Sequence, residues 1–170
     1  WINSIKNSRG LYLLIGPVGS GKTTAMYATI SQLVNAMEGQ VRAVSIEDPV
    51  EAFVEGICQS SYDSKTEKSL ASAFKHLLRQ DPDIIALGEI RDAESITEAL
   101  QAGLSGHLVL ATFHAGSAEE AIDRIKLMAT GNELILTGLR GIMQLNLSYE
   151  NGCAKACSRV KLFNNGRLFE

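Results

Sequence analysis

One stretch of the sequence decides the fold: Gly16-Pro17-Val18-Gly19-Ser20-Gly21-Lys22-Thr23. It follows the apolar run Leu11 to Ile15 and precedes a segment with helical periodicity. The stretch fits the pattern G-x-x-x-x-G-K-[ST], in which glycines allow a tight turn whose backbone N–H groups surround a phosphate. The helix that begins at Thr23 and Thr24 also favours an anion at its N-terminus. We therefore predict a phosphate-binding loop between a strand and a helix.

The side chains of this loop predict a site for ATP and Mg²⁺. Lys22 is expected to reach the β- and γ-phosphates and to act in catalysis, and the Thr23 hydroxyl is expected to bind Mg²⁺. The other residues from Gly16 to Thr24 are expected to contact the nucleotide through their backbone. A plain glycine-rich turn is the alternative, but the strand before and the helix after are the context that the motif requires.

Strand-like and helix-like segments alternate along the chain. Short apolar runs predict strands at residues 11–15, 41–46, 84–87 and 108–111. Amphipathic periodicity predicts helices at residues 22–36, 69–80, 92–102 and 117–129. Such alternation predicts an α/β fold with a mostly parallel, twisted sheet and helices on both faces.

Local signals refine the ends of these elements. Asp92 and Ser117 are predicted N-caps, and Gly39 and Gly103 are predicted helix ends. The polar stretch 56–68 is predicted to be a loop or a small hairpin. Near the end of the chain, residues 159–163 and 167–169 flank Asn164-Asn165-Gly166, which predicts a C-terminal β-hairpin.

Composition limits the classes of function. The 170 residues carry a net charge of −3, which gives no general attraction to nucleic acid. Three cysteines are too few and too scattered for a disulfide framework or a four-ligand zinc site, and no apolar run approaches the roughly 20 residues of a membrane span. We expect one domain over residues 1–170, and the start at Trp1 rather than Met suggests a piece of a longer protein.

Polar clusters follow the predicted strands, where ligands bind in parallel sheets. Glu89 is placed to orient or deprotonate an attacking water, and it is a further candidate ligand of Mg²⁺, directly or through water. Gly88 occupies the position at which the generic strand has a metal-binding Asp. Glu47, Asp48 and Glu51 form a second acidic group, expected to bind Mg²⁺ through water or to pair with an arginine. We expect Glu47 to act in catalysis, Asp48 to bind the metal and Glu51 to contact the nucleotide.

Two histidines flank the strand at residues 108–111. Seven extended residues span roughly 23 Å, so His107 and His114 cannot both reach one phosphate unless the chain bends. His114 is the predicted γ-phosphate sensor, whereas His107 is left between a structural hydrogen bond and a subunit contact. Arg91, Arg79 and Arg124 are candidates either for stabilising the transition state or for surface salt bridges.

Taken together, these segments resemble the secretion ATPase superfamily of type II secretion and type IV pilus systems. The matching stretches are residues 46–51, 78–85, 88–92, 106–109 and 112–114. The resemblance identifies the first acidic run with the Asp box, Glu89 with the Walker B glutamate, and His107 with His114 as the His box. It adds His107 and Arg91 to the expected nucleotide contacts.

The resemblance implies a RecA-like P-loop ATPase that works as a cytoplasmic homo-hexamer beside the inner membrane. Its partners would be an inner-membrane platform protein and the pilus or pseudopilus machinery. The N-terminal PAS-like domain, which usually supplies arginines to the γ-phosphate, and the C-terminal helical region are expected to be missing from these 170 residues. Two alternatives stay open: a nucleotide-binding regulatory module with little turnover, and a RecA-like motor on nucleic acid.

Overall fold

The computed structural model describes residues 1–38, 40–63, 69–129, 133–150, 153–164 and 167–169. Its strands form one eight-stranded sheet with the order β3-β2-β4-β5-β1-β6-β7-β8. The strands are β1 Gly10–Ile15, β2 Ala43–Glu47, β3 Ile57–Ser61, β4 Ile84–Ile90, β5 Leu108–Phe113, β6 Leu139–Glu150, β7 Cys153–Asn164 and β8 Arg167–Phe169. The pairs from β3 to β6 are parallel, and β7 and β8 add antiparallel strands at one edge. The predicted mostly parallel sheet is confirmed.

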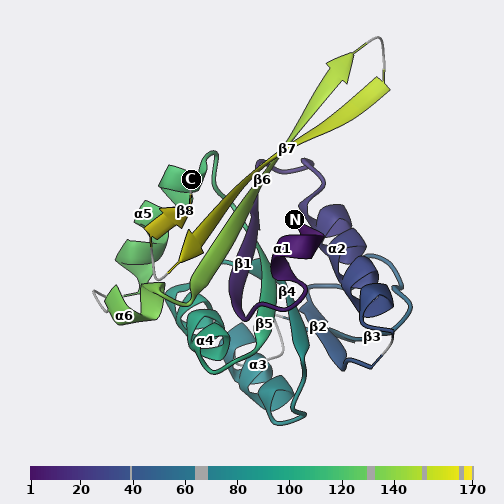
Figure 1. Cartoon of the computed structure of the whole chain (residues 1–170), viewed down its shortest axis with the longest axis vertical. Helices are drawn as coiled ribbons and strands as arrows, with labels where there is room; N and C mark the ends of the chain where they lie inside the picture. Colours follow the sequence, from purple (N-terminus) through teal and green to yellow (C-terminus); the bar gives the residue numbers. More distant parts are fainter. Residues whose placement is uncertain (39, 64–68, 130–132, 151–152, 165–166, 170) are drawn as a thin grey trace.

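Helices cover both faces of this sheet (Figure 1). They are α1 Ile2–Ile5, α2 Lys22–Ala36, α3 Leu70–Leu78, α4 Ala93–Leu104, α5 Ala118–Met128 and α6 Glu133–Leu136. The hydrophobic core between the sheet and helices α1 and α2 lies on one face. The core between the sheet and helices α3, α4 and α5 lies on the other. In the part of the chain that the structure describes, no helix is both long enough and apolar enough to cross a membrane.

The central strand β1 shows why the sheet needs helices on both sides. All six of its residues are buried. Leu11, Leu13 and Ile15 pack against the core of α3, α4 and α5, while Tyr12 and Leu14 pack against the core of α1 and α2. Alternate side chains of a strand point to opposite faces, so a continuous apolar run fits only a sheet that is covered twice.

The predicted helix N-caps are confirmed. The Asp92 side chain accepts a hydrogen bond from the N–H of Ser95, and the Ser117 side chain accepts one from the N–H of Glu120. These bonds satisfy backbone donors that a helix N-terminus leaves unpaired.

Two predictions about element boundaries need correction, and a third is not tested. Residues 57–61 form a parallel edge strand, β3, rather than a loop or hairpin. Gly103 lies inside α4, which continues to Leu104. This position accommodates glycine because a side chain there would collide with the backbone of Gly10 and Leu11. The predicted helix end at Gly39 lies outside the described residues.

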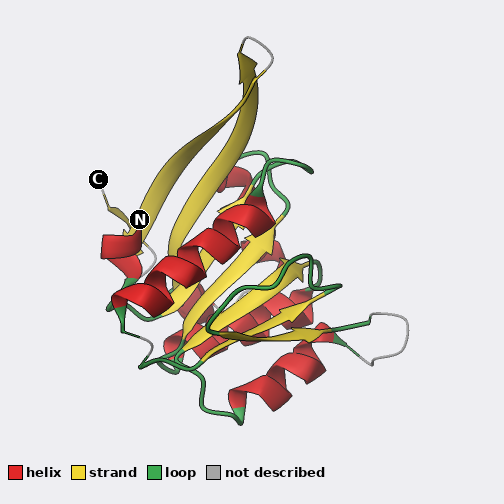
Figure 2. Ribbon diagram, turned by 90° about the vertical axis from the view of Figure 1, so that its right-hand side faces the viewer, coloured by secondary structure: helices red, strands yellow, loops and turns green. Residues whose placement is uncertain are grey.

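The C-terminal hairpin is confirmed, but it is preceded by a longer one. Strands β7 and β8 pair antiparallel next to the predicted turn, whose residues 165 and 166 lie outside the described part of the chain. Strands β6 and β7 also pair antiparallel, from Gly141 with Leu162 to Glu150 with Cys153. Their outer halves extend away from the helices and the rest of the sheet (Figure 2).

Candidate active site

A cavity of about 490 Å³ opens at the carboxyl edge of the parallel strands. Its walls come from the loop after β1 and the start of α2, from the ends of β2, β4 and β5 with the residues that follow them, and from Tyr62, Ser69 and Leu70. The predicted site residues that line it are Val18, Gly19, Lys22, Thr23, Glu47, Asp48, Glu51, Glu89, Arg91 and His114. The structure therefore brings the loop, the acidic run, the glutamate and one histidine together, although they are up to 96 residues apart in the sequence.

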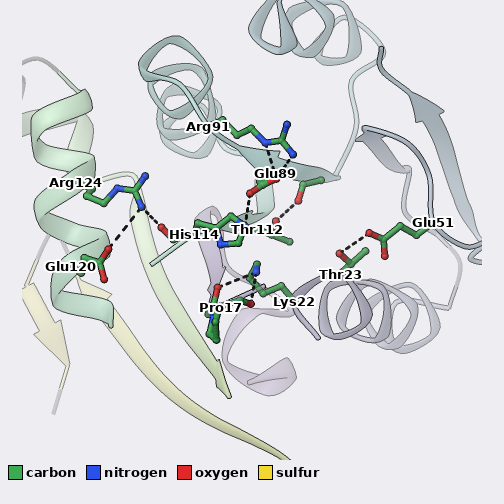
Figure 3. A network of polar contacts seen from close by, with 12 residues as sticks. Pro17, Lys22, Thr23, Glu51, Glu89, Arg91, Thr112, His114, Glu120 and Arg124 are labelled. Carbon is green, nitrogen blue, oxygen red and sulfur yellow. Dashed lines mark hydrogen bonds and ion pairs between the residues drawn. The ribbon is translucent and has the colours of Figure 1, made fainter. Parts of the chain in front are cut away.

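The loop between β1 and α2 has the backbone that its glycines predict. Gly19 and Gly21 have φ angles of 76° and 85°, in the left-handed region that favours glycine. Gly16 lies so close to the Leu145 carbonyl on β6 that a side chain would collide with it. The Lys22 ammonium donates to the carbonyl oxygens of Gly16, at 3.0 Å, and Pro17, at 2.9 Å (Figure 3). The Lys22 side chain thus folds back onto the phosphate-binding loop.

Electrostatics of the loop favour an anion. Burial lowers the pKa of the Lys22 ammonium, and the nearby Glu89 carboxylate partly opposes this effect. A phosphate next to Lys22 would compensate the charge that burial disfavours. The loop residues Pro17, Val18 and Gly19 are exposed, so the loop is open to a ligand from solvent.

A β-bulge directs Glu89 into the cavity. Leu87 pairs with Ala111 and Ile90 with Phe113, so two residues of β4, Gly88 and Glu89, lie opposite one residue of β5. Leu87 and Ile90 both remain in the same core, although regular alternation would point them to opposite faces.

The position of Gly88 in this bulge leaves little room for a side chain. A Cβ at Gly88 would lie 3.1 Å from Cα of Glu47. A side chain at this position would require β2 to shift by a few tenths of an ångström.

Two cationic or polar side chains hold the Glu89 carboxylate (Figure 3). Nε2 of His114 lies 2.9 Å from Oε1, and the Arg91 guanidinium donates to Oε2 through Nε at 2.8 Å and through its terminal nitrogen at 2.5 Å. The Glu89 side chain is 23% exposed, whereas that of Arg91 is 65% exposed. The carboxylate is therefore fixed, and Arg91 is the more movable of its partners.

Contacts beyond the cavity place His114. Arg124 donates to the His114 carbonyl oxygen, and its guanidinium lies 4.7 Å from the centre of the Phe113 ring. The Thr112 hydroxyl donates to the carbonyl oxygen of Gly88, which ties the end of β5 to the bulge. Of the three arginine candidates, Arg91 and Arg124 thus make contacts within the chain, and Arg79 is an exposed residue that ends α3.

The acidic run is divided between a buried and an exposed part. Asp48 and Glu51 are exposed, and the Thr23 hydroxyl lies 3.5 Å from Oε1 of Glu51. Glu47 is buried, with 3% exposure, and accepts hydrogen bonds from Tyr27, Ser45 and Gln59. These contacts favour a positioning role for Glu47; its catalytic role stays a prediction.

Oxygen donors next to the loop suit Mg²⁺, a hard cation that prefers oxygen. The Thr23 hydroxyl and the carboxylates of Asp48 and Glu51 all line the cavity beside Lys22. No group of three or more His, Cys, Asp or Glu side chains with metal-binding geometry occurs among the described residues. A magnesium ion here would therefore take most of its ligands from phosphate oxygens and water, as is usual for this cation.

The structure places His107 outside the cavity of this chain, and its inclusion among the nucleotide contacts stays a prediction. His107 comes just before β5 and His114 just after it, so the two residues lie at opposite ends of this strand. Nδ1 of His107 is 2.9 Å from the Pro82 carbonyl oxygen, before β4. His107 is expected to make either a structural hydrogen bond or a subunit contact, and the contact with Pro82 supports the structural hydrogen bond.

An α/β sheet with this loop and these strand-end carboxylates defines the class of P-loop domains. Within that class, the sequence pattern of the family "Type II/IV secretion system protein" matches residues 2–167. The chain belongs to this family.

A curated relative and two solved structures agree with the family. The "Type II secretion system protein E" of Pectobacterium carotovorum subsp. carotovorum is 42% identical over 143 residues, which are 84% of this chain and 28% of that protein. The chain thus spans less than a third of this relative. The ATPase DotB of Legionella pneumophila gives a TM-score of 0.83 at 26% identity, over 96% of this chain and 48% of that one. The pilus retraction motor PilT with bound ADP gives 0.78 at 30% identity, over 96% and 50%.

Proposed function

We propose that this chain is the ATP-hydrolysing motor domain of a type II secretion or type IV pilus machine. The observation that carries the proposal is the Glu89 carboxylate, which a bulge and His114 direct into the cavity that also contains Lys22. The ATPase DotB and the ADP-bound motor PilT support it by their similarity. We further propose that the whole protein is a hexamer on the cytoplasmic side of the inner membrane, beside its platform protein.

Lys22 and Glu89 take separate roles in the proposed reaction. Lys22 exchanges its contacts with the Gly16 and Pro17 carbonyl oxygens for phosphate oxygens, where its charge offsets the charge of the transition state. Glu89 orients the attacking water and accepts its proton, and His114 keeps the carboxylate in place. One carboxylate oxygen becomes available to the water when the exposed Arg91 side chain moves away.

Mg²⁺, when bound, would supply positive charge that offsets the negative charge of the phosphates. Thr23, with Asp48 and Glu51 through water, are the residues that would hold it. Few protein groups would bind the ion, which fits a cation that enters together with the nucleotide.

The test is Glu89→Gln, which removes the proton acceptor and keeps the shape. We expect ATP affinity to stay within about threefold of wild type and phosphate release to fall by at least about 100-fold. Glu94→Gln makes the same chemical change on the exposed surface of α4 and is the matched control. Unchanged hydrolysis in Glu89→Gln would remove Glu89 from the catalytic role.

One observation favours the second candidate, a nucleotide-binding module with little turnover. Arg91 and Arg124, which stand beside the site, both make contacts within the chain instead of pointing a free guanidinium at the loop. Tight Mg²⁺-dependent ATP binding by the wild-type protein, with no phosphate release under any condition in which it assembles, would support this module over the motor.

A further inference from the structure

The buried Glu47 carboxylate is a junction between three elements. Tyr27 of α2 donates to its Oε2, while Ser45 of β2, at 2.6 Å, and Gln59 of β3, at 3.2 Å, donate to its Oε1. Only 3% of the residue is exposed. A buried carboxylate is costly unless donors compensate it, so these contacts make Glu47 a fixed anchor.

Two of the three donors also bind the acidic loop that follows β2. The Tyr27 hydroxyl accepts a hydrogen bond from the N–H of Glu51 at 3.2 Å. The Gln59 amide donates to the carbonyl oxygen of Ala52 at 2.9 Å and accepts from the N–H of Val54 at 2.8 Å. The loop backbone is thus attached, through these two side chains, to the anchor at Glu47.

Tyr27 in addition connects this loop to the phosphate-binding loop. Residues i and i+4 lie on the same face of a helix, so Thr23 and Tyr27 point to the same side of α2. The Thr23 hydroxyl reaches the side chain of Glu51, and the Tyr27 hydroxyl binds its backbone N–H. One face of α2 therefore contacts the same acidic residue twice.

We propose that Tyr27 is a positioning residue for the Mg²⁺–nucleotide complex: its hydroxyl holds the loop bearing Asp48 and Glu51 at a fixed distance from Thr23. Gln59 assists from the other side of the loop. The inference rests on the proposed function, because it assigns these carboxylates to the metal. Tyr27 itself has no role in the chemistry.

Ser45 offers an internal comparison. Its hydroxyl binds the same carboxylate as Tyr27, but in the described part of the chain it makes no hydrogen bond to the acidic loop. Removing the Ser45 hydroxyl therefore weakens the anchor alone, whereas removing the Tyr27 hydroxyl weakens the anchor and frees Glu51. A purely structural role for Tyr27 predicts the same result for both changes.

The experiment titrates Mg²⁺ into the protein with a fixed concentration of a fluorescent ATP analogue and follows binding, not hydrolysis. For Tyr27→Phe we expect the midpoint of the Mg²⁺ titration to rise about 3- to 10-fold, since one hydrogen bond is lost on each side of the hydroxyl. Affinity for the analogue in excess EDTA should stay within about twofold of wild type. Ser45→Ala should lower the Tm and leave the Mg²⁺ midpoint unchanged.

A second variant guards against poor folding of the first. Gln59→Met keeps the length of the side chain and removes the amide that binds Ala52 and Val54. We expect the midpoint to shift in the same direction. A wild-type midpoint in both Tyr27→Phe and Gln59→Met would overturn the inference. If the wild-type protein binds the analogue equally well with and without Mg²⁺, the proposed function fails instead.

Discussion

Nε2 of His114 lies 2.9 Å from Oε1 of Glu89, at the ends of two neighbouring strands. The imidazole thus fixes the carboxylate that is proposed to orient water. We expect His114→Ala to lower kcat by about 10- to 100-fold, because Glu89 loses a partner that limits its rotation. KM for ATP should change by less than about threefold. Steady-state phosphate release at several ATP concentrations separates the two effects.

His107→Ala is the matched control for this prediction. His107 is bound to the Pro82 carbonyl oxygen, away from the cavity. We expect a lower Tm and a kcat close to that of wild type. A loss of kcat in His107→Ala as large as in His114→Ala, measured on equally folded protein, would contradict the placement of these two histidines.

The lowered pKa of Lys22 predicts an alkaline limit for nucleotide binding. ATP needs the charged ammonium, so affinity should fall as the pH rises through this pKa, earlier than for an ordinary lysine. Without nucleotide, the same lowered pKa has the opposite effect on the stability of the fold. Between the lowered pKa and the usual value of about 10.4, the unfolded state binds more protons, so stability rises with pH.

Titrations of ATP affinity between about pH 7 and pH 10 test this prediction. Lys22→Arg provides the comparison, because a guanidinium keeps its charge throughout this range. The variant should bind more weakly at neutral pH and show no alkaline decline. The same decline in both proteins would assign the effect to another group.

The ion pair between Glu119 of α5 and Lys161 of β7 predicts a contribution to stability that depends on pH. The hydrogen bond from Lys161 lowers the pKa of Glu119 to about 2. A lowered carboxyl pKa stabilises the fold above the ordinary value and loses this effect as the pH falls towards the folded value. Glu119→Gln should therefore be less stable than wild type near neutral pH, and the difference should shrink as the pH falls towards about 2.

Urea unfolding at a series of pH values measures this difference. The side chains of Lys161 and Glu119 are 37% and 67% exposed, so water screens their interaction. We expect a small difference in the free energy of unfolding, which about 1 M NaCl reduces further. Asp123→Asn, on the same helix, is the control and should show little dependence on pH. A difference between Glu119→Gln and wild type that is as large at pH 2 as at neutral pH would rule out the ion pair as its cause.

Gly103 predicts a packing effect that opposes helix propensity. Alanine in a helix interior is favoured over glycine by about 1 kcal/mol. However, a Cβ at residue 103 would lie 2.8 Å from the backbone nitrogen of Leu11 and 2.9 Å from Cα of Gly10, and a central strand cannot move aside easily. We expect Gly103→Ala to lower the free energy of unfolding by about 1–3 kcal/mol.

Chemical denaturation compares Gly103→Ala with Gln101→Ala, an exposed position on the same helix. The control should change the free energy of unfolding by no more than about 0.5 kcal/mol. A stabilised Gly103→Ala would show that α4 can shift away from β1.

The sequence predicts those elements whose physical signal is local. Strands β1, β4 and β5 are apolar because both of their faces are covered, and the caps at Asp92 and Ser117 are set by their own side chains. Strand β3 has no such signal, since it is an edge strand in which only Ile57 is buried. Its pairing with β2 depends on neighbours in space.

The site was predictable to the extent that its residues follow strands. The cavity collects Lys22, Glu89 and His114 because parallel strands end at one edge. The Tyr27 contacts were missed because a tyrosine inside a helix resembles any core aromatic. Only the fold shows that its hydroxyl meets Glu47, which comes 20 residues later.

The bulge in β4 has a consequence for substitutions at position 89. Because the extra residue lets Leu87 and Ile90 stay in one core, the residues on both sides of Glu89 pack normally while its side chain points to the cavity. We therefore expect an exchange of the reactive group at position 89 to disturb its contacts with His114 and Arg91 more than the packing of the core.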